Sequence, residues 1–181
     1  MSEHAAMVHE AHFGAEIPDT KEWRATVAHI KHLIDSKADL EVVDPELHNE
    51  TPLHFAVSYH LPETTRSLLA AGANPNAVVD SYGEPAPLLA DIARWPYNFP
   101  DSLALRTMRV LLEGGADPNV VFGSDSFTPM MNAMCFGHPA AGRLLVEFGA
   151  PKPTTVEPGW EFYFGKIHSE FIQGLGEACA I

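Results

Sequence analysis

The chain has 181 residues, with 24 Asp and Glu against 11 Lys and Arg, so its formal net charge is -13 with histidine neutral. This excess of carboxylates argues against a nucleic-acid binder or a peripheral membrane protein, because it would repel phosphate backbones and anionic lipids. The apolar fraction of 46% argues against a disordered acidic chain and indicates a globular protein.

The N-terminal segment shows no targeting signal. Residues 1–20 contain no Lys or Arg, so a secretory n-region is missing, and no apolar stretch reaches the ~20 residues that span a bilayer. The two cysteines, Cys135 and Cys179, match neither a disulfide framework nor a metal-ligand spacing. We therefore expect a cytoplasmic protein.

Two helices are expected before residue 36. The first covers about residues 2–13 and ends at Gly14. Asp19 and Glu22 then fit a capping box, which opens the second helix. Apolar residues at helical spacing continue it, namely Trp23, Val27, Ile30 and Ile34.

A repeat follows. Gly-Ala steps at residues 72, 115 and 149 are separated by 43 and 34 residues, and each comes shortly after a Leu-Leu pair. A second set of matched segments precedes them and begins at Thr51-Pro52, Ala86-Pro87 and Thr128-Pro129. Repeats at this period indicate stacked supersecondary units, because one unit cannot bury its apolar face alone.

Each unit is predicted to be helix, turn, helix and extended loop. Thr51 is a good N-cap and Pro52 suits the first helical position. The Leu-Leu pair ends the second helix, and Gly72 suits a left-handed C-cap. The following Asn-Pro-Asn run favours a turn over further helix.

These residues resemble the ankyrin repeat family over about residues 44–151, through Thr51-Pro52-Leu53-His54, the Gly-Ala-Asn-Pro-Asn run from Gly72 and Gly137-His138. The resemblance implies an all-α solenoid of helix-turn-helix units with short loop or β-turn fingers and about four repeats including caps. Lys37 replaces the glycine in a degenerate first unit. Ala86-Pro87 lacks the family's threonine, and Met131 replaces its histidine, so weaker or different hydrogen bonding is expected there.

The expected units are a capping repeat over 1–43, repeats over 44–79, 80–121 and 122–153, and a closing helix with a tail over 154–181.

The middle unit is eight residues longer than the other two, with an insertion over residues 95–102. Its aromatic residues either fold back on neighbouring repeats or form a contact patch.

After the helix-breaking Pro158-Gly159, a stripe of apolar residues at helical spacing is expected to pack on the last repeat. It consists of Trp160, Phe164, Ile167 and Phe171.

The sequence contains no assembled catalytic motif. His9 and His12 lie three residues apart, whereas a metalloprotease helix needs two histidines four apart. There is no phosphate-binding loop and no nucleophile elbow, and Cys135 has no evident basic neighbour. We expect no enzyme, no cofactor and no physiological metal site.

Ankyrin-like arrays bind proteins through loop tips and the first helix of each unit. This resemblance places partner contacts on the loops and on helix positions expected to be exposed, including Ser58, Ala93 and Cys135. The predicted partner-binding residues are His48, Glu50, Tyr59, Tyr82, Arg94, Trp95, Tyr97, Phe99, Asp125, Phe127 and Phe136.

Acidic residues are concentrated near the first loop. Residues 1–50 contain eleven Asp and Glu and four Lys and Arg. Such a run is ordinarily solvated, but beside a loop tip it would steer a basic partner through a field that salt weakens. The candidate steering residues are Asp39, Glu41, Asp44 and Glu46.

We therefore expect a non-catalytic protein-binding module that acts as an adaptor or inhibitor. Its sharper form is an immunity-type partner that neutralises a basic toxin or enzyme. The alternatives are a regulatory subunit of an enzyme complex and a metal-binding protein that uses its histidines. The sequence leaves the oligomeric state open.

Overall fold

The computed structural model describes residues 21–47, 49–81, 84–94, 103–123, 126–153 and 171–175. The expected helix over residues 2–13, the Asp19 of the capping box and the insertion over residues 95–102 lie outside these ranges. Within the described ranges the chain is mostly helical, as expected.

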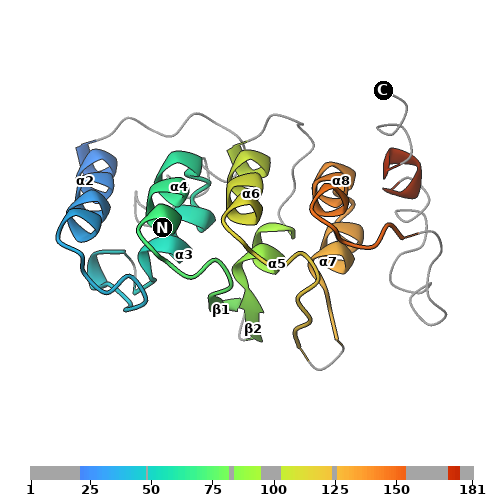
Figure 1. Cartoon of the computed structure of the whole chain (residues 1–181), viewed down its shortest axis with the longest axis horizontal. Helices are drawn as coiled ribbons and strands as arrows, with labels where there is room; N and C mark the ends of the chain where they lie inside the picture. Colours follow the sequence, from blue (N-terminus) through green and yellow to red (C-terminus); the bar gives the residue numbers. More distant parts are fainter. Residues whose placement is uncertain are drawn as a thin grey trace, which may run out of the picture.

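The helices lie in two rows (Figure 1). The longer ones form the long-helix row, which consists of α2 (Lys21–Asp35), α4 (Pro62–Ala70), α6 (Leu103–Glu113) and α8 (Pro139–Glu147). The short-helix row consists of α3 (Pro52–Ser58), α5 (Leu88–Ile92) and α7 (Pro129–Cys135). Helices contact their neighbours within each row, and the pairs α3–α4, α5–α6 and α7–α8 connect the rows. Successive helix pairs therefore lie side by side.

The short helices begin where the sequence predicts. Thr51 Oγ1 accepts a hydrogen bond from the His54 backbone N–H at 3.2 Å, and Thr128 Oγ1 accepts one from the Met131 N–H at 3.3 Å. Helix α5 follows Pro87, which makes no side-chain capping bond, and it has five residues where α3 and α7 have seven. The missing threonine thus coincides with the shortest helix of the row.

The long helices end at residues with a left-handed backbone. Gly72, Gly115 and Gly149 have φ between 97° and 100°, which suits glycine because it has no Cβ. Lys37 stands at the corresponding position after α2 and has φ 55°. The left-handed conformation after the helix is therefore kept at Lys37, although a residue with a Cβ adopts it at some energetic cost.

The loops carry little regular structure. Strands β1 (Val78–Ser81) and β2 (Glu84–Pro87) form an antiparallel pair in which Val78 faces Pro87. In the first and third loops the described residues form single bridges, Asp44 with Glu50 and Phe122 with Phe127. The 3-10 helix η1 (Pro45–Leu47) lies within the first loop.

The hydrophobic core runs along the stack. One cluster extends from Ile30 in α2 to Leu175 near the C-terminus. Its fully buried members come from both rows and include Leu53, Leu68, Leu88, Leu111 and Leu145. Each helix pair therefore buries its apolar side chains against the pairs beside it, as a repeat array requires.

Residues 171–175 are helical and cover the last helix pair. Phe171 and Leu175 are buried, and a Cβ added at Gly142 would lie 2.5 Å from Phe171 Cζ. Arg143 Nη1 donates to the Gly174 carbonyl at 2.7 Å. Phe171 thus packs on the last helix pair as predicted, whereas Trp160, Phe164 and Ile167 lie outside the described residues.

Candidate functional site

The loops that follow the long helices lie together along one edge of the molecule, beside the short-helix row (Figure 1). We call this surface the loop edge and define it by residues 36–51, 71–87 and 114–128. Of these, residues 48, 82–83 and 124–125 lie outside the described ranges.

Side chains hold neighbouring loops in register. Glu41 Oε1 accepts a hydrogen bond from the Asn74 backbone N–H, and Asn76 Oδ1 accepts one from the Asp117 N–H, both at 2.8 Å. Asn76 and Asn119 also donate to the carbonyl of a glycine in the next unit, Gly115 and Gly149 respectively. We call Glu41, Asn76 and Asn119 the ladder residues, because they occupy equivalent places in three successive loops.

The predicted steering carboxylates also make contacts within the molecule. Asp44 Oδ2 lies 2.8 Å from His29 Nε2 in α2, and the hydrogen bond with His29 holds the pKa of Asp44 below its usual value. Glu46 Oε2 lies 3.4 Å from His29 Nδ1, yet its side chain is 74% exposed. Asp39 Oδ1 accepts from the Glu41 N–H at 3.0 Å. Their role in steering stays a prediction.

Glu50 lies in a mixed polar cluster between the first loop and the short-helix row. Its Oε2 lies 4.0 Å from His54 Nδ1, and this oxygen is buried without a hydrogen-bond partner among the described residues. Burial, and then the charge of Asp91 in α5, raises the pKa of Glu50 to about 7. Burial lowers the pKa of His54. The cluster therefore favours the neutral forms of both side chains.

Two positions expected to be exposed are buried, which corrects the prediction. Tyr59 is 8% exposed and its ring stacks on Phe55 with 4.3 Å between centroids. Burial, and then the charge of Glu50, raises the pKa of Tyr59 to about 12. Ala93 is fully buried. Both residues follow a short helix and belong to the hydrophobic cluster that runs along the stack.

The other described contact candidates reach the surface to different degrees. Arg94 is partly buried, and its Nη1 lies 3.6 Å from Asp91 Oδ1. Phe127 is half-buried beside Phe122, whereas Phe136 is 52% exposed. Glu50 and Arg94 thus both interact with Asp91, and Tyr59 interacts with Glu50. Several candidates lie outside the described residues, namely His48, Tyr82, Trp95, Tyr97, Phe99 and Asp125.

Sequence reasoning missed a set of exposed apolar residues on the loop edge. Val43, Val78 and Val121 are 57%, 63% and 61% exposed. Each follows a ladder residue by two positions, so each occupies the same place in its loop. The signal was present in the repeat alignment, but apolar residues in a repeat are ordinarily assigned to the core. We call these three residues the valine stripe.

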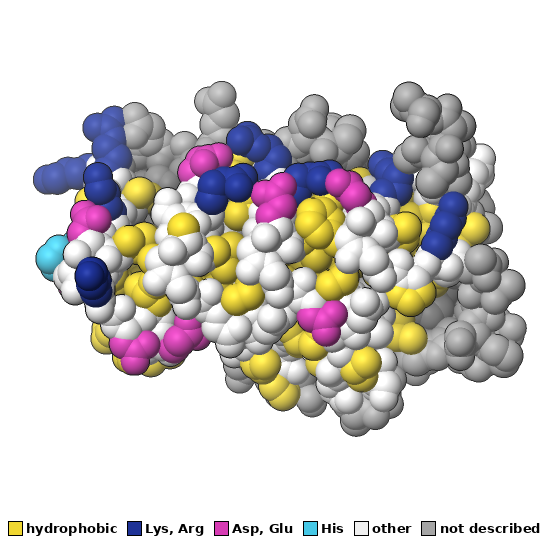
Figure 2. Space-filling view, in the orientation of Figure 1, with side chains coloured by type: hydrophobic (Ala, Val, Ile, Leu, Met, Phe, Trp, Pro, Cys, Tyr) yellow, Lys and Arg dark blue, Asp and Glu magenta, His cyan; other side chains and the backbone are white. Residues whose placement is uncertain are grey.

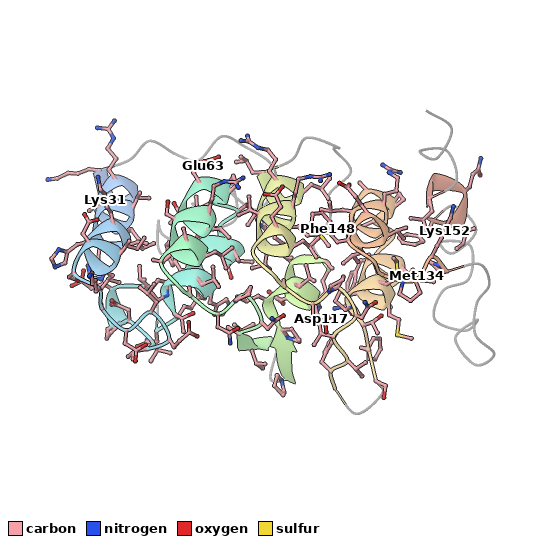
Figure 3. All side chains as sticks on the ribbon, viewed as in Figure 1. Lys31, Glu63, Asp117, Met134, Phe148 and Lys152 are labelled. Carbon is pink, nitrogen blue, oxygen red and sulfur yellow. The ribbon has the colours of Figure 1, made fainter. Side chains whose placement is uncertain are left out.

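Charge divides between the loop edge and the long-helix row. Residues 38–61, 71–93 and 114–138, which contain the loops and the short helices, have ten Asp and Glu and no Lys or Arg. Helices α4, α6 and α8 have four Arg and three Glu. Figure 2 shows the result, with mixed charges along the long helices and acidic side chains over the loops below them. Asp117, labelled in Figure 3, belongs to this acidic region.

The described residues offer little for chemistry. Burial raises the pKa of the Cys135 thiol to about 11, which keeps it protonated at neutral pH. Within the described ranges, no group of three or more His, Cys, Asp and Glu side chains is arranged to hold a metal ion. The histidines of residues 1–20 lie outside those ranges. None of the described helices combines the length and apolarity that crossing a membrane demands.

Comparison with known proteins gives one result that bears on identity. A search among curated proteins finds no match. The ankyrin repeat family matches residues 48–80, which cover α3, α4 and the first three residues of β1. The matched segment includes the capping residue Thr51 and the left-handed Gly72 described above. Residues 48–80 therefore form a segment that is similar to an ankyrin repeat.

Proposed function

We propose that this chain is a non-catalytic protein-binding module, a solenoid of about four ankyrin repeats including its caps, that binds a partner with a basic surface. The ankyrin repeat is a protein-interaction module, which supports the general function. The observation that carries the basic partner is the charge of residues 38–61, 71–93 and 114–138, which contain ten Asp and Glu and no Lys or Arg. A one-sign surface raises the association rate of an oppositely charged partner.

The contact residues in this proposal come from the described surface of the loop edge and its neighbours. Glu46, Phe127 and Phe136 are exposed or half-exposed there. Asp39 and Glu41 contribute negative charge while they also brace the loops. The module acts as an adaptor or as an inhibitor that masks a basic toxin or enzyme. We place it in the cytoplasm because its two cysteines fit no disulfide framework.

The test is charge reversal at two matched glutamates. Glu46 on the loop edge and Glu63 on α4 have side chains that are 74% and 77% exposed. We expect Glu46→Lys to reduce recovery of the stoichiometric partner from native cells at low salt, and Glu63→Lys to leave it unchanged. If both variants reduce recovery of the partner equally, or if neither reduces it, the loop edge is not the binding surface.

A second measurement separates the two roles. If the recovered partner is an enzyme or toxin, its activity is measured with and without the wild-type chain. Loss of activity that Glu46→Lys relieves identifies an inhibitor, and unchanged activity in the complex identifies an adaptor.

A further inference from the structure

The valine stripe repeats at one position in three neighbouring loops. Val43, Val78 and Val121 each follow a ladder residue by two positions, and the ladder bonds hold these loops beside one another. A single exposed valine is ordinary on a protein surface, whereas recurrence at an equivalent position places an exposed apolar side chain in each of three neighbouring loops. The neighbouring Val42, which is 56% exposed, enlarges it at the first loop.

The surroundings of the stripe restrict what covers it. The segments of the loop edge, which carry the three valines, contain nine Asp and Glu and one Lys, Lys37. A second copy of this chain is an unfavourable occupant, because its net charge is also -13. An anionic lipid surface is repelled for the same reason. A favourable occupant therefore combines apolar side chains with Lys or Arg.

We propose that the valine stripe binds a partner segment in which apolar side chains alternate with lysines or arginines. This inference rests on the proposed function, and it adds that apolar contact on the loop edge, together with charge, selects the partner. The valines contribute the apolar contact, since burial of their exposed methyl groups removes them from water. The acidic residues of the same loops attract the basic side chains.

The probes are three short synthetic peptides that separate these contributions. One alternates lysine with leucine, the second alternates lysine with serine, and the third alternates glutamate with leucine. Fluorescence anisotropy at low salt measures their affinity for the full chain. We expect the lysine–leucine peptide to bind most tightly, the lysine–serine peptide more weakly, and the glutamate–leucine peptide least.

The decisive variant replaces all three valines by serine. Because these side chains are exposed, V43S/V78S/V121S is expected to fold, and circular dichroism checks that it does. Affinity for the lysine–leucine peptide should fall by about tenfold, and affinity for the lysine–serine peptide should stay unchanged. The control is Val27→Ser, because Val27 is an exposed valine of α2 outside the loops. The single variant Val78→Ser gives a smaller loss if the triple variant fails to fold.

Two results overturn the inference. One is equal affinity of the wild-type chain for the lysine–leucine and lysine–serine peptides. The other is a triple variant that loses both peptides equally or neither. If the peptide results overturn the inference but Glu46→Lys still releases the native partner, the proposed function stands and only the role of the valine stripe is wrong. If the peptide series behaves as expected but no native partner responds to Glu46→Lys, the proposed function fails.

Discussion

The long-helix row and the loop edge differ in how their charged residues are arranged. On the long helices, cations and anions of neighbouring units meet. Arg109 makes two hydrogen bonds to Glu147, at 2.6 and 2.9 Å, and Arg66 Nη1 lies 3.2 Å from Glu113 Oε2. The segments of the loop edge contain nine Asp and Glu against a single basic residue, Lys37. The long-helix row thus neutralises much of its own charge, and the loop edge keeps a net negative charge.

The two regions also connect their units differently. The long-helix row uses exposed ion pairs, which contribute little because water and salt screen them. The short-helix row, which borders the loop edge, uses a buried amide: Asn132 Nδ2 in α7 donates to the Ala90 carbonyl in α5 at 2.8 Å. A buried hydrogen bond is costly to break, because its partner is left unsatisfied. The difference predicts which substitutions matter for stability.

The largest expected effect concerns Glu50, whose raised pKa is a destabilising feature of the loop edge. In the unfolded chain the carboxyl ionises near 4.5, whereas in the folded chain its pKa is about 7. The folded state therefore holds the proton more tightly, and stability falls as the pH rises between these values and then levels off. Glu50→Gln should be more stable than the wild type by up to about 3 kcal/mol at pH 8, with the difference vanishing towards pH 4.

Urea unfolding of both proteins across this pH range measures the difference. Comparison with the wild type isolates Glu50 from His54, whose lowered pKa acts in the opposite direction, since it destabilises the fold as the pH falls below 6.5. Glu63→Gln is the control, because Glu63 is 77% exposed on α4. A pH-independent difference for Glu50→Gln would refute the assigned burial.

An intermediate effect is expected at Asn132. Asn132→Ala removes the buried bond to Ala90 and should cost about 1–3 kcal/mol of the free energy of unfolding. Asn119 makes an analogous amide-to-carbonyl bond to Gly149, but it is exposed. Asn119→Ala should therefore cost less than about 0.5 kcal/mol. Thermal and urea unfolding measure the stability of both variants. Equal losses of the free energy of unfolding would contradict the expectation that the buried bond contributes more than the exposed one.

The smallest effect is expected on the long-helix row. A double-mutant cycle with Arg109→Met and Glu147→Gln should give a coupling of about 0.2–1 kcal/mol that decreases as salt is added. The hydrogen bond with Arg109 holds the pKa of Glu147 below its usual value, so Arg109→Met should also raise that pKa in an NMR titration. A coupling that is larger and insensitive to salt would show that this pair is not a solvent-exposed one.

Much of the helical framework follows from local sequence. Thr51 caps the helix that it was predicted to cap, Thr128 caps the helix that begins at the matched segment, and Gly72 ends α4 with the expected left-handed backbone. The exposure of individual residues was harder to predict. Tyr59 was expected on the surface and is buried, whereas the valine stripe was overlooked and is exposed.

The sequence by itself determined several of the described helix boundaries, such as the starts of α3 and α7 and the end of α4, because capping bonds, proline and left-handed glycine act within a few residues of the chain. Tertiary structure alone decided which charges pair and which side chains are covered. Arg66 meets Glu113 and Asn132 meets Ala90 across more than forty residues of chain. Such contacts depend on how one helix pair packs on the next, and the pattern of a single unit does not contain that information.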